Sequence, residues 1–146
     1  MTHASTCLFC RIAARRMPAH IVHETGRVVA FLDIAPIRPG HTQIVPKEHH
    51  SCFDDLPADL LAEMAATGQR VARALKAIYG VRRVGFAFTG TDVAHAHAHV
   101  VPLVEFDDLT SRRYIAEETV TYRNPPRPSD EAMAETAERI RGMLQG

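Results

Sequence analysis

Three histidines at alternate positions, His95, His97 and His99, are the residues whose types and spacing suggest chemistry most directly. Successive side chains of a β-strand point to opposite faces, so a strand here would place all three imidazoles on one face. The outer two would lie roughly 13 Å apart, whereas a zinc ion binds its ligands at about 2.0–2.1 Å. One metal ion therefore cannot take all three, and we expect the imidazoles to have different roles. A purely structural role for all three is a weaker interpretation of this strict alternation.

His97 lies between the other two histidines, and we expect it to be a nucleophile. A neutral imidazole is a good nucleophile near neutral pH, because its unperturbed pKa is about 6.5. It attacks phosphorus and also leaves readily, so a covalent phospho-imidazole would divide one difficult displacement into two easier ones. The neighbouring imidazoles would donate hydrogen bonds to the phosphoryl oxygens.

Cys7 and Cys10 form a C-x-x-C pair near the start of the sequence. A closed zinc site needs two further ligands, for which His49 and His95 are the candidates, with His50 as an alternative to His49. Two other interpretations remain open. The pair could be redox-active, which is disfavoured because no strand precedes it, or the two cysteines could be buried without a chemical role.

Length and composition indicate a single domain over residues 1–146, with 46% apolar residues and a formal net charge of zero. The local pairs Arg82-Arg83 and Arg112-Arg113 are too short for a nucleic-acid footprint, so we expect no nucleic-acid partner. No apolar run approaches the roughly 18 residues of a membrane span, and no leader sequence opens the chain. We therefore expect a soluble, cytoplasmic protein without a membrane partner. Three cysteines without a secretion signal argue against disulfides, and Cys52 is expected to be a small core residue.

Hydrophobic periodicity predicts an antiparallel α+β fold. It consists of a five-stranded sheet with one long central helix, a short N-terminal helix and a C-terminal helix. The strands are expected at 20–24, 27–32, 41–45, 84–88 and 95–101. The helices are expected at 7–17, from an N-cap at 55–57 to Gly80, and at 129–144 with Ser129 as the cap. The motifs fall within a core of residues 7–104, which a C-terminal extension follows.

The pattern His95-x-His97-x-His99-Val100-Val101 resembles the signature of the histidine triad (HIT) family of nucleotide hydrolases and transferases. Three other segments resemble family segments in the same order along the chain. They are Cys7–Ile12, Phe31–Ile34 and Pro39–His49.

This resemblance implies a sheet of the predicted kind, usually doubled into a homodimer. It also implies that His97 attacks the α-phosphate of a nucleotide to form a nucleotidyl-histidine, which water or another acceptor resolves. His99 would contact the phosphate, and His95 would complete a structural zinc site with Cys7, Cys10 and His49. Asp33 matches the carboxylate that holds the ribose hydroxyls. The positions that would line the base pocket are Phe9, Ile12, Phe31, Leu32 and Ile34. For Phe31 and Leu32, an ordinary core role is equally open.

The chain departs from the family pattern in the loop before the triad, where members usually carry a longer segment rich in Asn and Gly. Here Gly90 is followed by Thr91 and Asp92, and the loop is several residues shorter. The hydroxyl of Thr89 or Thr91 would replace the missing phosphate contacts. Asp92 would repel a polyphosphate leaving group, so an amine or a small leaving group is favoured, and Asp92 could also protonate a departing amine.

Two hypotheses follow for the function. The first is an enzyme that hydrolyses or transfers the nucleotidyl group of a nucleoside phosphoramidate or a related conjugate. The second is a zinc-stabilised nucleotide-binding module with little turnover, because the shortened loop would lose contacts to the leaving group. A hydrolase that uses His-x-His as metal ligands is disfavoured, since no histidine follows His99.

Overall fold

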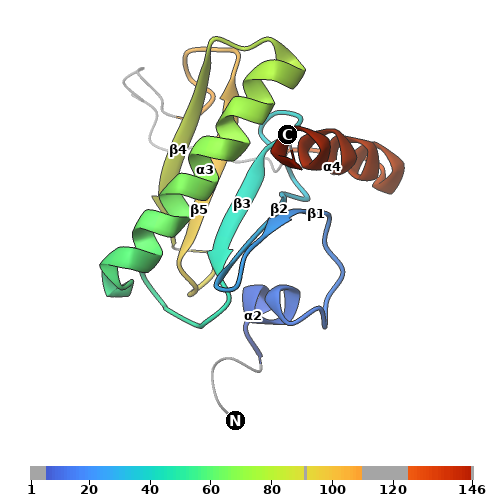
Figure 1. Cartoon of the computed structure of the whole chain (residues 1–146). Helices are drawn as coiled ribbons and strands as arrows, with labels where there is room; N and C mark the ends of the chain where they lie inside the picture. The colour runs from blue at the N-terminus through green and yellow to red at the C-terminus, as the bar shows by residue number, and fades with distance from the viewer. Residues whose placement is uncertain (1–5, 91, 110–124, 146) are drawn as a thin grey trace, which may run out of the picture.

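A five-stranded antiparallel sheet forms the centre of the computed structural model, which describes residues 6–90, 92–109 and 125–145 (Figure 1). The strand order is β1-β2-β3-β5-β4, and every neighbouring pair is antiparallel. The strands are β1 (Ile21–Glu24), β2 (Val28–Leu32), β3 (Thr42–Pro46), β4 (Arg83–Thr89) and β5 (His97–Leu103). The predicted fold class is thereby confirmed, with strand ends shifted by one or two residues.

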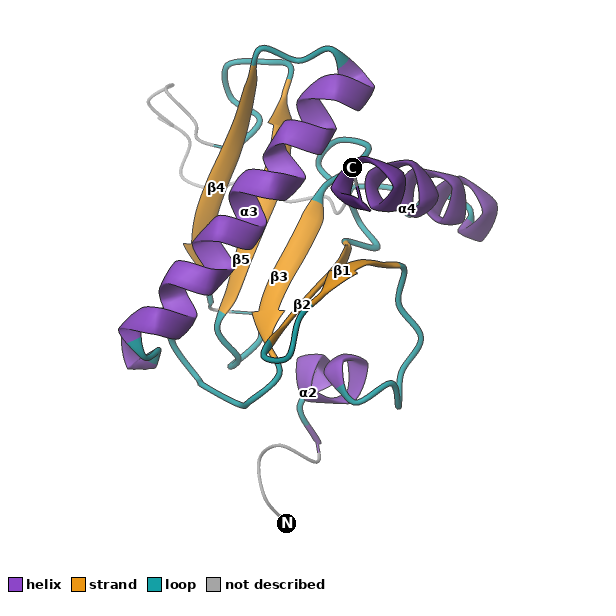
Figure 2. Ribbon diagram, viewed as in Figure 1, coloured by secondary structure: helices purple, strands orange, loops and turns teal. Residues whose placement is uncertain are grey.

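Helix α3 (Ala58–Tyr79) covers one face of the sheet, as Figure 2 shows. Its inner side is a buried stripe that includes Met64, Val71 and Leu75. The helix ends at Gly80, whose φ of 66° is left-handed and whose N–H donates to the Lys76 carbonyl at 2.9 Å. The predicted N-cap is corrected. Pro57 itself is the N-cap residue, without a side-chain cap, because the preceding residues form the 3₁₀ helix η1 (Phe53–Asp55).

Two further helices complete the described structure. Helix α4 (Asp130–Gln145) packs beside α3, and the Ser129 hydroxyl accepts the Ala132 N–H at 3.2 Å, as expected for a cap. Helix α2 (Leu8–Ala13) is shorter than the predicted 7–17, since the chain turns through a left-handed Arg15.

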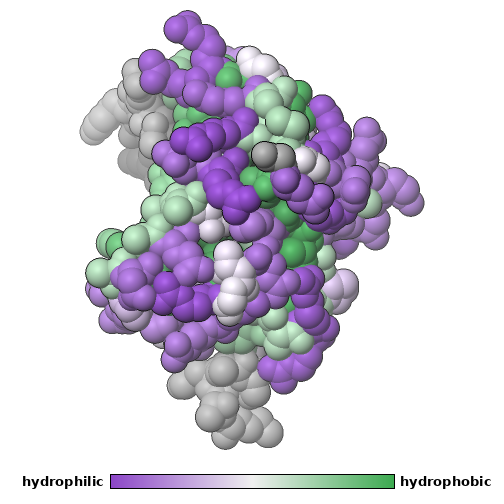
Figure 3. All heavy atoms as spheres, in the orientation of Figure 1, coloured by the Kyte–Doolittle hydropathy of each residue, from purple (hydrophilic) through white to green (hydrophobic). Residues whose placement is uncertain are grey.

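Hydrophilic residues predominate over α3 and α4 on the face seen in Figure 3. No helix among the described residues is long and apolar enough to cross a membrane.

The alternation of side chains divides the sheet into two apolar clusters. Val28, Ala30 and Leu32 of β2 join the α3 cluster, whereas Val29 and Phe31 belong to a cluster with helix α2. On β5 and just before it, the alanines at 96 and 98 and Val100 belong to the α3 cluster. The histidines that alternate with them therefore face the α2 side.

The start of strand β5 also differs from the prediction. The strand begins at His97, so His95 lies in the bend before it rather than on it. The His95 N–H donates to the Val93 carbonyl at 2.8 Å, and the Ala96 N–H donates to the His50 carbonyl at 2.7 Å. These hydrogen bonds lie within a loop and are not part of the pairing between β5 and β4.

Cys52 is exposed, which corrects its expected place in the core.

Gly40 provides a test of how the loop before β3 is held against α3. Its φ is +90°, and a Cβ there would lie 2.6 Å from Leu75 Cδ2 and 2.7 Å from Tyr79 Cε2. Gly40→Ala should therefore lower the free energy of unfolding by about 2–4 kcal/mol, measured by urea denaturation. The matched control is Gly142→Ala in α4, where nothing lies within 4 Å of the added Cβ. It should raise the free energy of unfolding by about 0.5–1 kcal/mol. A Gly40→Ala protein as stable as the wild type would contradict this account.

Candidate functional site

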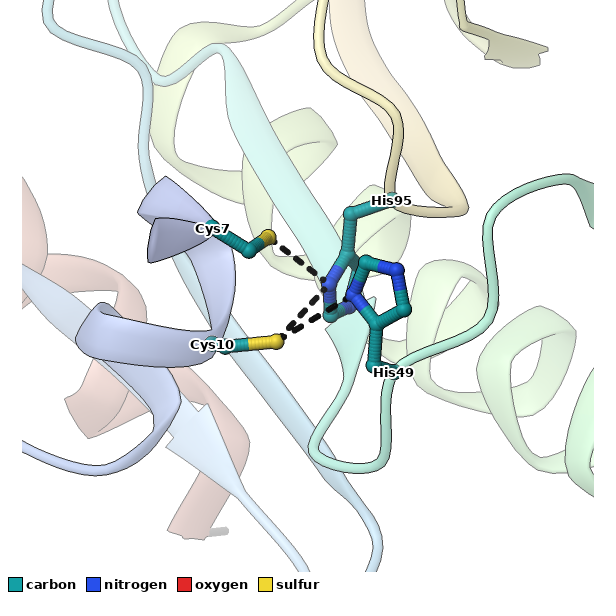
Figure 4. A group of neighbouring side chains, drawn as sticks. All are labelled: Cys7, Cys10, His49 and His95. Atoms are coloured by element: carbon teal, nitrogen blue, oxygen red, sulfur yellow. Dashed lines mark hydrogen bonds between the residues drawn. The ribbon is translucent and has the colours of Figure 1, made fainter. Parts of the chain in front are cut away.

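Cys7, Cys10, His49 and His95 converge from three separate segments of the chain (Figure 4). Cys10 Sγ lies 3.3 Å from His49 Nδ1 and 3.4 Å from His95 Nδ1, and Cys7 Sγ lies 3.4 Å from His95 Nδ1. All four candidate ligand atoms lie within 4.8 Å of one another. Tetrahedral ligands at zinc bond lengths are about 3.3–3.8 Å apart, so this donor set fits a zinc ion. The group takes His49 and not His50.

The hydrogen bonds of His95 leave one of its ring nitrogens free for a metal. The ring is fully buried, and its Nε2 lies 2.9 Å from the Pro46 carbonyl. A carbonyl only accepts, so Nε2 carries the hydrogen and the Nδ1 lone pair faces the sulfurs. Burial lowers the pKa of His95 to about 4, which keeps the ring neutral. Burial raises the pKa of the Cys10 thiol to about 11, so a metal ion must displace that proton.

In His97 the unprotonated nitrogen is Nε2, whereas in His95 it is Nδ1. The residue is completely buried, and its Nδ1 lies 2.7 Å from the His95 carbonyl. Nδ1 therefore carries the hydrogen, and the lone pair is on Nε2. The ring of Phe9 from helix α2 packs edge-on against His97, with 5.1 Å between centroids. This contact and the backbone bond together fix the orientation of the imidazole.

A directional chain of hydrogen bonds reaches His97 Nε2 from the loop before β3. The Ile37 N–H donates to His41 Nδ1 at 3.2 Å, so His41 Nε2 carries the hydrogen and donates to His99 Nδ1 at 2.9 Å. His99 Nε2 then donates to the Thr89 hydroxyl at 2.8 Å. The Thr89 hydroxyl donates to His97 Nε2 at 3.3 Å. Because a backbone donor starts this chain and a backbone acceptor ends it, one tautomer of each neutral ring satisfies every bond.

The same chain argues against a second metal at Asp33, His41 and His99, although their ligand atoms also lie within 4.8 Å of one another. His41 offers Nε2 to that cluster, and the Ile37 N–H on Nδ1 obliges Nε2 to carry the hydrogen. Burial lowers the pKa of His41 to about 4 and also lowers the pKa of His99. Both rings are thus neutral donors and acceptors at neutral pH.

A pocket of about 370 Å³ opens beside this chain. It contains all of the positions that the resemblance assigned to a base pocket. They are Phe9, Ile12, Phe31, Leu32 and Ile34. The first four are buried, whereas Ile34 is 57% exposed at the rim.

Asp33 lies in the same pocket, where Ala35 N–H donates to its Oδ1 at 2.8 Å and Gln43 Nε2 donates to its Oδ2 at 2.7 Å. Asp92 also lines the pocket, and its Oδ1 lies 3.5 Å from His97 Nε2. The structure thus brings Thr89 and Asp92 close to His97. Thr91 and the arginine pair at 112–113 lie outside the described residues.

Sequence reasoning did not single out His41 or Gln43. Both lie within the segment that resembles the family, and strand alternation could have found them. Gln43 of β3 is the register partner of His99 on β5, and His41 lies two residues before it. Residues at such spacing share a face, so a polar pair beside the triad was visible in the sequence.

Several known proteins are similar to this chain in sequence. The HIT domain model matches residues 14–106 of the chain. An uncharacterised HIT-like protein of Methanocaldococcus jannaschii is 36% identical over 105 residues, which cover 69% of this chain and 81% of that protein. The adenosine 5′-monophosphoramidase of Saccharomyces cerevisiae is 33% identical over 99 residues, which cover 67% of this chain and 63% of that protein.

Solved structures are similar over nearly the whole chain. A Zn-bound histidine triad family protein of Mycobacterium smegmatis is 29% identical with a TM-score of 0.74, covering 97% of this chain and 95% of that one. A HIT-like protein of Bartonella henselae has a TM-score of 0.80 at 23% identity and full coverage of its own chain, which supports the fold alone. Since the matched segment 14–106 contains all five strands together with His95, His97 and His99, the chain belongs to the histidine triad (HIT) family.

Proposed function

We propose that the chain is a nucleotidyl hydrolase or transferase that acts on nucleoside 5′-phosphoramidates through a nucleotidyl-histidine at His97. The observation that carries this proposal is the directional chain of hydrogen bonds that ends at this ring. It leaves the Nε2 lone pair of a buried imidazole beside a pocket of nucleoside size. The sequence identity of 33% with the yeast adenosine 5′-monophosphoramidase supports the same reaction class.

The proposed nucleoside site follows from the pocket beside the triad. The base would lie against the apolar side chains of Phe9 and Phe31, whose rings pack on each other with 5.6 Å between centroids. Asp33 would accept hydrogen bonds from the ribose hydroxyls, because each of its oxygens has a further lone pair beyond the bonds described above. Gln43 orients that carboxylate and so acts through Asp33.

The proposed reaction has two steps. His97 Nε2 forms a bond to the α-phosphorus, the P–N bond to the amine breaks, and the departing nitrogen keeps the electron pair and takes a proton from solvent. Water then attacks the phosphorus, the P–Nε2 bond breaks, and a water proton is released. In both steps His99 Nε2–H and the Thr89 hydroxyl would donate to the phosphoryl oxygens, in exchange for the bonds they make to each other and to His97.

We also propose that Cys7, Cys10, His49 and His95 hold a structural zinc ion, which the zinc-bound homologue of Mycobacterium smegmatis supports. Four protein ligands leave no open position for substrate, so the metal would stabilise the fold rather than take part in the reaction. Its effect on the site would be indirect. His95 contributes one ring nitrogen to the metal and its backbone carbonyl to His97.

We further propose a homodimer that pairs the β4 edge of the sheet. β4 is a seven-residue edge strand, and Phe86 on it is 42% exposed. Phe53, which is 53% exposed, stacks on the next aromatic residue of that strand, Phe88, at 5.5 Å between centroids. A long edge strand with exposed aromatic side chains is a template for pairing with a second copy of the chain.

Sedimentation velocity tests the proposed dimer. The sedimenting particle should have twice the monomer mass of 16.2 kDa, and a particle of the monomer mass would contradict the proposal.

His97→Ala tests the nucleophile. Turnover of adenosine 5′-phosphoramidate should fall by about a thousandfold or more, because no other group offers an equivalent lone pair to the phosphorus. An acid-quenched mass spectrum of the wild type should show a nucleotidyl adduct that the variant lacks. The matched control is His23→Ala, a histidine on β1 outside the site.

The outcomes of this experiment separate the two hypotheses. Equal turnover by wild type and His97→Ala would refute the mechanism. Tight nucleotide binding by the wild type, without product or adduct after prolonged incubation, would instead indicate a binding module.

Cys10→Ser tests the zinc site. Bound zinc, measured by mass spectrometry of the metal, should fall well below one ion per chain, and the melting temperature should fall by about 10 °C. Cys52→Ser is the control, because Cys52 is exposed and outside the cluster. The prediction fails when both variants retain the zinc content and melting temperature of the wild type.

A further inference from the structure

A second depression lies beside the nucleoside pocket, across the segment that precedes the triad. Its volume is about 650 Å³, and its lining includes Thr6, Ser51 and the segment Asp92–Ala94, together with the zinc-site residues Cys7 and His49. Asp92 and Val93 also line the nucleoside pocket. The two hollows therefore share one wall, and His97 Nε2 lies 3.5 Å from the carboxylate on that wall.

This arrangement gives a substrate a defined path. A nucleotide with its base in the first pocket and its α-phosphorus at His97 Nε2 would have its amine leaving group outside the nucleoside pocket. The carboxylate of Asp92 is 71% exposed and lies in the wall that the two hollows share. A leaving group that enters the second depression would therefore pass this carboxylate.

The charge in the lining of the second depression is negative. Asp92 is the one acidic or basic side chain among its described lining residues, apart from the His49 imidazole. A zinc ion with two thiolates and two neutral imidazoles has no net charge, so metal loading would not offset the carboxylate. A cation in the depression is therefore attracted, and a phosphate or carboxylate group is repelled.

We propose that this depression is a leaving-group subsite for amines that carry a second, cationic group, and that Asp92 recognises that charge. The preferred substrates are nucleoside phosphoramidates of diamines or of amines with a similar positive tail. This inference rests on the proposed phosphoramidase activity and specifies the half of the substrate that the nucleoside pocket does not contact. Asp92 acts here as a specificity-determining residue, because it contacts the tail and not the reacting phosphorus.

The test compares three adenosine 5′-phosphoramidates with tails of similar length. The amines are 1,3-diaminopropane with a cationic tail, n-butylamine with a neutral tail, and 4-aminobutyrate with an anionic tail. In the wild type, kcat/KM should fall about threefold from the cationic to the neutral substrate, and again to the anionic one, as expected for an exposed charge. High salt should compress both ratios, because the carboxylate is exposed to solvent.

Asp92→Asn should bring both ratios close to one, and comparison of substrates within the variant cancels any general loss of activity. Asp54→Asn is the control, since it removes an exposed carboxylate of η1 that does not line either hollow. It should leave the ratios unchanged. The melting temperature of each variant confirms that it is folded.

Three results would overturn this inference. They are equal kcat/KM values for the three substrates in the wild type, ratios that persist in Asp92→Asn, and ratios that Asp54→Asn abolishes equally. None of these affects the proposed activity as long as unsubstituted adenosine 5′-phosphoramidate is turned over. If the wild type does not hydrolyse that parent compound, the proposed function itself has failed, and the subsite fails with it.

Discussion

The hydrogen bond from His97 Nδ1 to the backbone carbonyl of His95 is the interaction on which the rest of the site depends. A fully buried imidazole must satisfy its N–H group, and a carbonyl can only accept. The lone pair is therefore obliged to be on Nε2, which faces the Thr89 hydroxyl and the Asp92 carboxylate. Without that bond the ring could adopt the other tautomer, and the nitrogen beside the nucleoside pocket would carry a hydrogen instead of a lone pair.

The same backbone segment connects His97 to the cluster of candidate metal ligands. His95 faces the two cysteines through its own Nδ1, and it donates from Nε2 to the carbonyl of Pro46 at the end of β3. A displaced His95 would move both the candidate metal ligand and the acceptor for His97. The proposed zinc site and the proposed catalytic site therefore share His95, although the proposed reaction does not pass through the metal.

Sequence patterns predicted the fold because each pattern has a local cause. The alternation of histidine and alanine from residue 95 puts small side chains against α3 and imidazoles on the other face, and the structure has this arrangement. The sequence could not show that the strand starts only at His97, since alternation continues through His95 while its hydrogen bonds go to a loop. The cap of α3 was misplaced for a similar reason. Asp55 is a good cap by residue type, but η1 takes it out of position.

The candidate site was predicted less completely than the fold. The structure brings the four candidate metal ligands together, and the residues assigned to a base pocket line one pocket. Strand alternation placed His41 on the same face as Gln43, but its contact with His99 arises from pairing between β3 and β5, which the sequence alone does not specify. The order of donors and acceptors through His41, His99 and Thr89 depends on two backbone groups, which residue types alone do not specify.

The central claim is that backbone groups fix which nitrogen of each imidazole is free, and nitrogen NMR of the folded protein tests it most directly. Long-range ¹H–¹⁵N correlation spectra of the zinc-loaded protein at neutral pH distinguish the two neutral tautomers of each ring. We expect His97 to be protonated at Nδ1 with an unprotonated Nε2, and His41 and His99 to be protonated at Nε2. A neutral His97 with its hydrogen on Nε2 would contradict the account, because that ring would have no lone pair to offer to phosphorus.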